Sequence, residues 1–235
     1  MVPNGGILIR VTVVYGQNHH GNTWSLTQLL LSHLVFDPTE IQEFTLTGIR
    51  ACVGCLSCIT NDERLCPNQA FVQPIIQAIE QADVVVFASP TYCFGMTGQM
   101  KELCDHFVYR WMSHRPADMR RKIGVAVTTA AGGGAKAAAK EIARQFRWWS
   151  VGEIHLLPFL IQAEKWDAIS SKRKLGIQRR TERLARRINQ TAGHARQNIP
   201  GRFLFFVMGL MMRHNDWNPV DAAWWKERYQ GSGNR

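Results

Sequence analysis

The sequence predicts an α/β protein built on a doubly wound parallel sheet of five strands. Between residues 7 and 161, short β-branched runs bounded by turn residues alternate with segments whose apolar residues recur at helical spacing. Three of the predicted strands end in loops rich in glycine or proline, each directly before a predicted helix. Strands that alternate with helices in this way form a parallel sheet with helices on both faces.

The five strands are predicted from the apolar runs, taken in chain order. Ile7–Tyr15 is the first, and Glu40–Leu46 alternates enough to be the second. Asp83–Ala88 is a continuous apolar run, which is typical of a strand that is buried on both faces. Lys122–Thr129 and Val151–Ile161 complete the sheet, and we expect the Asp83–Ala88 strand at its centre.

Four helices are expected between these strands. The first follows Gly21, the second has Pro74 in its first turn, the third begins at Thr97, and the fourth follows three consecutive glycines. The residues Gly48–Cys66 are expected to form a long loop. The apolar positions predicted to face the sheet are Leu26, Leu29, Leu30, Leu34, Val72, Ile75, Ile76, Ile79, Met100, Leu103, Phe107, Trp111, Ala138, Ile142 and Phe146.

Composition places the chain among ordinary globular proteins. It has 235 residues, of which 46% are hydrophobic and 20% charged, which excludes a disordered or fibrous chain. Its apolar stretches, such as Phe203–Met212, are shorter than the ~20 residues of a membrane-spanning helix. The N-terminus lacks the pattern of a signal peptide, so we expect a cytoplasmic protein. Six cysteines in that compartment point to ligation or redox chemistry rather than to disulfides.

Beyond the predicted sheet the chain becomes basic and then aromatic. The net charge is +10, and residues 171–200 carry nine Lys or Arg against the single acid Glu182. A long basic helix is expected from Ser170, with an apolar stripe and an end at Pro200–Gly201. Its charges are interpreted as a solvated face, with an anionic membrane, an acidic partner or nucleic acid as alternatives, and nucleic acid is not the expected partner.

The segment after that helix exposes apolar surface that something must cover. Phe203–Met212 and the aromatic tail Asp216–Tyr229 would be covered by a second subunit, by the chain's own domain or by a membrane interface. We expect a dimer-closing arm first and docking on the same chain second. The chain is accordingly divided into a sheet domain, residues 1–165, and a helical extension, residues 166–235.

Two loops at strand ends have the composition of binding loops. The loop that ends at Gly21-Asn22-Thr23 lies between a strand and a helix N-terminus, where free N–H groups and the helix dipole favour a phosphate monoester. Its spacing matches neither a dinucleotide-binding motif nor a P-loop. The loop after the central strand contains proline, aromatic residues and Gly95, which suit a flat ring. The alternative for both loops is an ordinary turn.

A third pattern is a run of closely spaced cysteines. Cys52, Cys55 and Cys58 are separated by two residues each, and Cys66 follows after seven more. Thiolates are the ligands of iron-sulfur clusters, and short spacings allow one loop to hold one cluster. Zinc is a poorer fit, because structural zinc loops pair two well-separated Cys-x-x-Cys units.

These motifs together resemble the flavodoxin-like NAD(P)H-dependent FMN reductases, including their iron-sulfur flavoprotein branch, over residues 7 to about 160. The resemblance implies an FMN phosphate site formed by Gln17, Gly21, Asn22, Thr23 and Trp24. It implies an isoalloxazine ring that lies against Pro90, Thr91, Tyr92, Phe94 and Gly95, with Gly132 and Gly133 near its far edge. One departure is His106, where relatives tend to have an arginine near the subunit or ring surface.

The function implied by this resemblance is an oxidoreductase that uses FMN and NAD(P)H to reduce a quinone-like or other small acceptor, as a homodimer or homotetramer. The alternative is an electron-transfer protein with a 4Fe-4S cluster on Cys52, Cys55, Cys58 and Cys66. Reductases of this fold that lack a cluster also tend to carry cysteines at this place, so the cluster stays open. No catalytic side chain is predicted, because the flavin performs the redox step.

Overall fold

The computed structural model describes residues 9–34, 40–113 and 118–231. The sheet in this part of the chain has five parallel strands in the order β2-β1-β3-β4-β5. Their bounds are β1 Val11–Tyr15, β2 Ile41–Thr45, β3 Val84–Pro90, β4 Ile123–Ala130 and β5 Glu153–Leu160. The predicted parallel sheet and its central strand are confirmed, and the Ile7 end of the first predicted strand lies outside the described residues.

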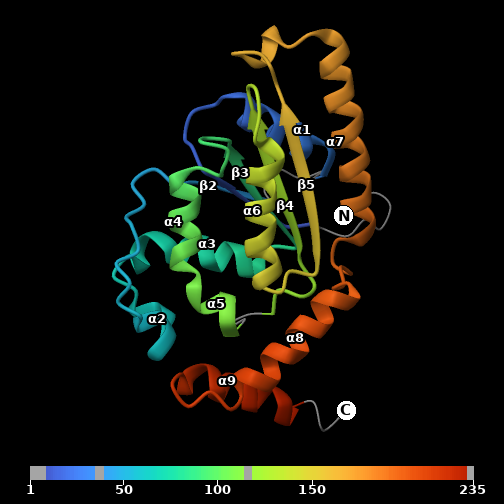
Figure 1. Ribbon diagram of the computed structural model, residues 1–235. Coiled ribbons are helices and arrows are strands. Elements are labelled where there is room, and N and C mark those ends of the chain that lie inside the picture. Colours follow the sequence, from blue (N-terminus) through green and yellow to red (C-terminus); the bar gives the residue numbers. More distant parts are fainter. Residues whose placement is uncertain (1–8, 35–39, 114–117, 232–235) are drawn as a thin grey trace.

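Helices cover both faces of the sheet (Figure 1). One face is covered by α1 Asn22–Leu34 and α7 Ser171–Thr191, and the other by α3 Gln69–Gln81, α4 Gly98–His106 and α6 Ala135–Trp148. In β3 successive side chains point to opposite faces, so Val84 and Val86 join the first core while Val85 and Phe87 join the second. A strand buried on both sides explains why the run is apolar throughout.

The third predicted helix divides in two. It begins after Thr97, whose side chain accepts a hydrogen bond from the Met100 N–H. α4 ends at His106, and the chain continues as α5 Val108–Ser113 after a break at Phe107. Phe107 leaves the helical conformation but stays fully buried against Trp149, with ring centroids 5.1 Å apart. Packing of this ring therefore outweighs continuity of the helix.

Two details around α3 differ from the prediction. Gly48–Cys66 is not a loop throughout, since it contains α2 Ser57–Thr60 and the short 3₁₀-helix η2 Glu63–Leu65. α3 begins at Gln69, so Pro74 lies inside the helix rather than in its first turn. The sequence places the start of this helix too late because its apolar residues at helical spacing begin only at Val72. The residues before Val72 are more polar, but they are also helical.

The C-terminal extension is helical, as predicted, but its break point is different. α7 ends at Thr191 and is followed by Gly193 in a left-handed conformation. α8 Ile199–Met212 then begins with Pro200 in its first turn, and the Asn198 side chain caps it by accepting from the Gly201 N–H. Pro200 therefore starts a helix instead of ending one, because the first turn does not need its missing N–H.

The last helices fold back onto the chain's own domain. α9 Pro219–Gly231 follows α8, and both lie at the bottom of Figure 1, opposite the carboxyl ends of the strands. Met208, Met212 and Trp225 form a small buried cluster that includes the partly buried Trp148 of α6. None of the helices among the described residues combines the length and apolarity that crossing a bilayer requires.

Candidate functional site

Three strand-to-helix loops meet at the carboxyl edge of the sheet, at the top of Figure 1. The loop after β1 is joined to β3 by the Gly16 N–H, which donates to the Ala88 carbonyl at 2.8 Å. The Thr97 hydroxyl, at the end of the loop after β3, donates to the Gly16 carbonyl at 3.1 Å. A Cβ at Gly16 would lie 2.3 Å from Thr97 Oγ1, so this approach requires glycine.

The loop after β4 is held against the other two. The Thr91 N–H donates to the Thr129 carbonyl at 2.8 Å, and the hydroxyls of Thr129 and Thr23 lie 2.6 Å apart. Gly134 has a φ of +86°, and a Cβ there would lie 2.9 Å from the Phe94 Cα. The structure therefore brings the three predicted loops together, as parallel strands with right-handed crossovers lead one to expect.

A small cleft opens between the first two loops. Five of the residues predicted to bind FMN line it: Gln17, Gly21, Thr23, Trp24 and Pro90. The first-turn N–H groups of α1 face this loop and lack partners within the helix, so the cleft has the donors that an anion requires. Tyr15, His19 and Ala88 also line it, although the sequence does not predict them as binding residues.

Aromatic residues border the cleft on the side of α1. The rings of His20 and Trp24 stack with centroids 4.3 Å apart, which fixes the indole beside the loop. Burial and the adjacent Glu43 carboxylate raise the pKa of Tyr15, whose hydroxyl donates to that carboxylate at 2.5 Å. Tyr15 therefore stays neutral at physiological pH and adds no negative charge to a site that would receive a phosphate.

The predicted ring-binding residues form a tight turn. Tyr92 and Gly95 exchange two backbone hydrogen bonds of 3.1 and 3.0 Å, and Cys93 and Phe94 between them have φ values of 50° and 63°. The turn holds Phe94 outward with 73% of its surface exposed. Glu141 on α6 supports it, since one carboxylate oxygen accepts from the Met96 N–H at 2.9 Å.

Two predicted residues differ from the expected arrangement. The Asn22 side chain points away from the anion loop, because its amide donates to the carbonyls of Ala163 and Glu164 at 3.1 and 3.2 Å. Gly132 is exposed and a Cβ there would contact nothing within 4 Å, whereas one at Gly133 would lie 3.4 Å from Phe94. The Asn22 side chain thus joins α1 to the segment after β5. Of Gly132 and Gly133, only Gly133 lies against the turn between Tyr92 and Gly95.

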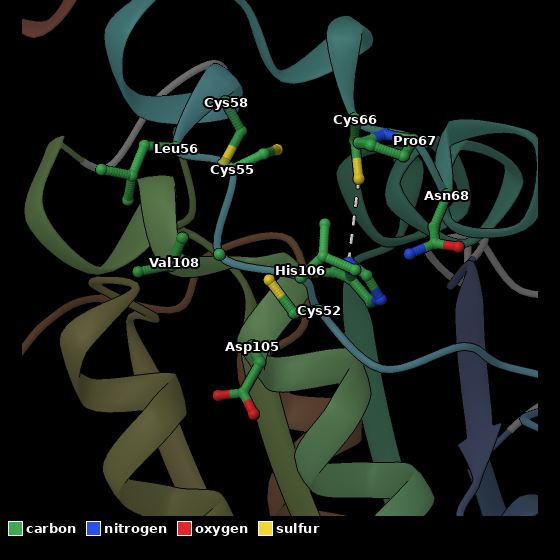
Figure 2. A pocket seen from close by; sticks show the side chains of 12 residues that line it. Cys52, Cys55, Leu56, Cys58, Cys66, Pro67, Asn68, Asp105, His106 and Val108 are labelled. Carbon is green, nitrogen blue, oxygen red and sulfur yellow. Dashed lines mark hydrogen bonds between the residues drawn. The ribbon is translucent and has the colours of Figure 1, made fainter.

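The four clustered cysteines line a second pocket, on the side of α4 (Figure 2). Cys52 and Cys55 are exposed, while Cys58 and Cys66 are partly buried. Positive φ values at Gly54 and Leu56 turn the loop between Cys52 and Cys58. α4 connects the two sites, since its first turn follows the ring-binding loop and its last residues, Asp105 and His106, line the cysteine pocket. Figure 1 shows the cysteine segment beside α4, below the level of the flavin loops.

His106 is a functional candidate that the sequence marked only as a departure from related proteins. It does not lie at the surface: it is buried, its Nδ1 lies 3.7 Å from the Cys66 Sγ, and its Nε2 lies 2.8 Å from the Arg50 carbonyl. Figure 2 shows the ring below Cys66, facing the pocket. Its signal was its position on the inward face of α4, three residues after the buried Leu103.

The four thiols differ in their electrostatic surroundings. Burial, together with the charges of the other three cysteines, raises the pKa of Cys58 to about 11. Hydrogen bonds from Ser57 lower the pKa of the exposed Cys55. Among the described residues, no group of three or more His, Cys, Asp or Glu side chains is arranged to hold a metal ion. The donor chemistry suits a cluster, but the arrangement is not a preformed site.

Comparison with known proteins shows which family this chain belongs to. The model of the NADPH-dependent FMN reductases matches residues 9–158, which contain all three loops and the cysteine segment. The chain belongs to this family. Its three loops correspond to the carboxyl edge of the sheet, where α/β proteins of this topology bind their ligands.

Curated relatives and solved structures are similar to this FMN reductase homologue. An iron-sulfur flavoprotein of Archaeoglobus fulgidus is 26% identical over 53% of this chain, and one of Methanocaldococcus jannaschii is 29% identical over 47%. The matches span only 55% and 56% of those relatives. An azoreductase of Bacillus anthracis has the same fold, with a TM-score of 0.55 and 13% identity, over 77% of this chain and 98% of its own. Its likeness supports the flavodoxin-like fold alone.

Proposed function

We propose that this protein is an FMN-dependent oxidoreductase that takes reducing equivalents from NAD(P)H and passes them to a small acceptor such as a quinone. The observation that carries the proposal is the cleft in which Gln17, Gly21 and Thr23 of one loop face Pro90 of the next. Its glycine, its helix N-terminus and its neutral Tyr15 suit a phosphate group. Membership of the FMN reductase family supports FMN as the ligand.

In this proposal each loop has a separate role. The first loop and the start of α1 hold the phosphate through Gln17, Gly21, Asn22, Thr23 and Trp24, with Asn22 acting through its backbone N–H because its side chain is engaged elsewhere. The second loop, Pro90, Thr91, Tyr92, Phe94 and Gly95, borders the ring, and Gly132 and Gly133 lie at its far edge.

When bound, FMN supplies the hydride and electron chemistry. The protein's own contribution is to orient the cofactor through rigid loops, and the bonds of Thr91 and Thr23 to Thr129 provide that rigidity. Phe94 and Tyr92, which are exposed, would shield a bound ring from water on one side. No side chain is assigned as acid or base, since hydride transfer requires none.

The test is FMN binding by the purified protein, measured by quenching of flavin fluorescence, together with NADH and NADPH oxidation. Replacing Gln17→Ala should raise the Kd for FMN by about tenfold or more, because one hydrogen bond to a charged phosphate is lost. Gln178→Ala, which removes an exposed amide on α7, is the matched control and should leave the Kd unchanged. A protein that binds no FMN at micromolar concentration would contradict the proposal.

A second candidate is an electron-transfer protein with a 4Fe-4S cluster on the four cysteines. Two observations favour it: one pocket is lined by Cys52, Cys55, Cys58 and Cys66, and two relatives are named iron-sulfur flavoproteins. The family match favours the reductase instead. Anaerobic purification with iron and sulfide assays separates the two. Flavin bands alone support the reductase, whereas a broad brown absorbance with roughly four irons per chain supports the cluster.

Other expectations stay predictions. We propose a homodimer or homotetramer by analogy with the family, a cytoplasmic location, and a division into residues 1–165 and 166–235. α7 belongs to the core of the sheet domain through Ile177, Leu184 and Ile188. An experiment that locates the domain boundary should therefore compare chain cleavage before α7 with chain cleavage after it. Size-exclusion chromatography with light scattering measures the number of subunits.

A further inference from the structure

α8 carries an apolar stripe that faces away from the protein. Ile199, Phe203, Phe206 and Leu210 are spaced by four, three and four residues, so they share one side of the helix. Their exposed fractions are 82%, 68%, 53% and 37%. The opposite side of α8 is the one that packs on the domain, through Met208 and Met212. The helix therefore has apolar residues on both sides, and the domain covers only one of these sides.

Positive charge flanks this stripe. Arg202 follows Ile199 by three residues and precedes Phe206 by four, so helical geometry places it beside both. Arg196 lies just before α8, and both arginines are exposed. The preceding helix α7 also carries exposed arginines, which are Arg179, Arg180, Arg183, Arg186 and Arg187.

We propose that the exposed side of α8 binds the surface of an anionic membrane, with the stripe inserted among the lipids and the arginines at the phosphate level. A helix that combines bulky apolar residues with flanking cations binds in this way. With 14 residues, α8 is about 21 Å long, which suits a helix that lies in the plane of the interface. Trp217, which follows α8, is also exposed, and indole rings favour the interface region.

Charge is the reason for choosing lipid over a second copy of the chain. A two-fold interface packs this patch against the same patch of a second copy, so it would gather Arg196 and Arg202 of both chains at one interface in a protein of net charge +10. Nucleic acid would pair with the arginines and its bases could stack on Phe203 and Phe206, but it gives no role to the exposed aliphatic residues Ile199 and Leu210 of the same stripe. An anionic bilayer accounts for both features.

The test is co-sedimentation of the full chain with vesicles of phosphatidylcholine alone and vesicles that also contain phosphatidylserine. We expect binding to the anionic vesicles only, and weaker binding at high salt. The double variant Phe203→Ser/Phe206→Ser should lose that binding. Arg196→Gln/Arg202→Gln should weaken it about thirtyfold, from the usual contribution of two cations near an anionic surface.

Matched controls separate this effect from general changes in apolar surface or charge. Leu175→Ser removes an exposed apolar residue of α7, and Lys140→Gln/Arg144→Gln removes two exposed cations of α6, so both should bind vesicles like the wild type. Equal thermal melting of all variants shows that they are folded. The proposal is overturned if the wild type ignores anionic vesicles or if the phenylalanine variant still binds them. It is equally overturned if the phenylalanine variant converts a dimer to monomers, which would make the stripe a subunit interface. Loss of DNA binding instead of vesicle binding in the arginine variant would also overturn it.

Discussion

At the scale of single residues, the turn between Tyr92 and Gly95 is the most constrained part of the candidate flavin site. Both of its central residues, Cys93 and Phe94, adopt left-handed backbone conformations that favour Gly or Asn. Two cross-turn hydrogen bonds and the close contact of Phe94 with Gly134 hold them there. Strain at a ligand-facing loop is often retained because it fixes a side chain, and here it fixes Phe94 outward.

This strain gives a stability prediction. Cys93→Gly should raise the free energy of unfolding by about 0.5 to 1 kcal/mol, because relief of the left-handed conformation exceeds the added entropy of the unfolded chain. Urea unfolding measures the change. Ala131→Gly, in an exposed loop position without a positive φ, adds only the entropy and should lower stability slightly. If both variants shift in the same direction, the turn is not strained.

At the scale of elements, α3 contains a defect that the sequence analysis placed in a harmless position. Pro74 lies six residues into the helix, where it removes the N–H that would bond to the Ala70 carbonyl. The helix tolerates it because Val72, Ile75 and Ile76 on either side are buried in the core. Tertiary packing therefore holds a helix that its local sequence weakens.

Removing the proline should stabilise the protein. Pro74 is exposed, so Pro74→Ala restores a helical hydrogen bond without disturbing the core and should raise the free energy of unfolding by about 1 to 2 kcal/mol. Thermal or urea unfolding measures this. Gln77→Ala, at another exposed position of α3, should change stability by less than about 0.5 kcal/mol. An unchanged or lower stability for Pro74→Ala would mean that α3 is bent to fit the proline.

At the scale of the whole molecule, an ionic contact joins the C-terminal helix to the domain. Asp118, just before β4, pairs with Arg120 at 2.6 Å and with Arg228 of α9. Arg120 also lies over the Phe205 ring of α8, 4.3 Å from its centre. Burial alone would raise the pKa of Asp118, but hydrogen bonds from Arg120 and the charges of both arginines outweigh it and hold the pKa at about 2.

A carboxylate whose pKa is lowered on folding stabilises the folded state above its ordinary pKa, and the effect is lost as the pH falls through the folded value. The contact should therefore be complete at neutral pH and weaken between pH 3.8 and about 2. Asp118→Asn should reproduce that loss at pH 7, seen as a red shift and easier quenching of the fluorescence of the buried Trp225. Asp167→Asn, whose side chain is fully exposed, is the control. Equal spectra for both variants would show that the apolar cluster alone holds α9.

The local sequence was sufficient for the five strands, for the four main helices between them and for the central place of Asp83–Ala88 in the sheet. Apolar runs such as Asp83–Ala88 must be buried on both faces, and their alternation with helical segments leaves few topologies other than a parallel sheet. The convergence of the three loops follows from the same rule. Element ends were less predictable, as Pro74 and Pro200 show, because the first turn of a helix carries little apolar pattern.

The sequence by itself determined the fold class and the family, and it predicted the edge of the sheet where a ligand would bind. Only the tertiary structure decided that Asn22 turns away from the anion loop, that His106 faces Cys66, and that α8 covers one apolar side and leaves the other open. The physical reason is that burial periodicity is a local property of the chain. The partner of a polar group and the covered side of a helix depend on residues that are distant in sequence.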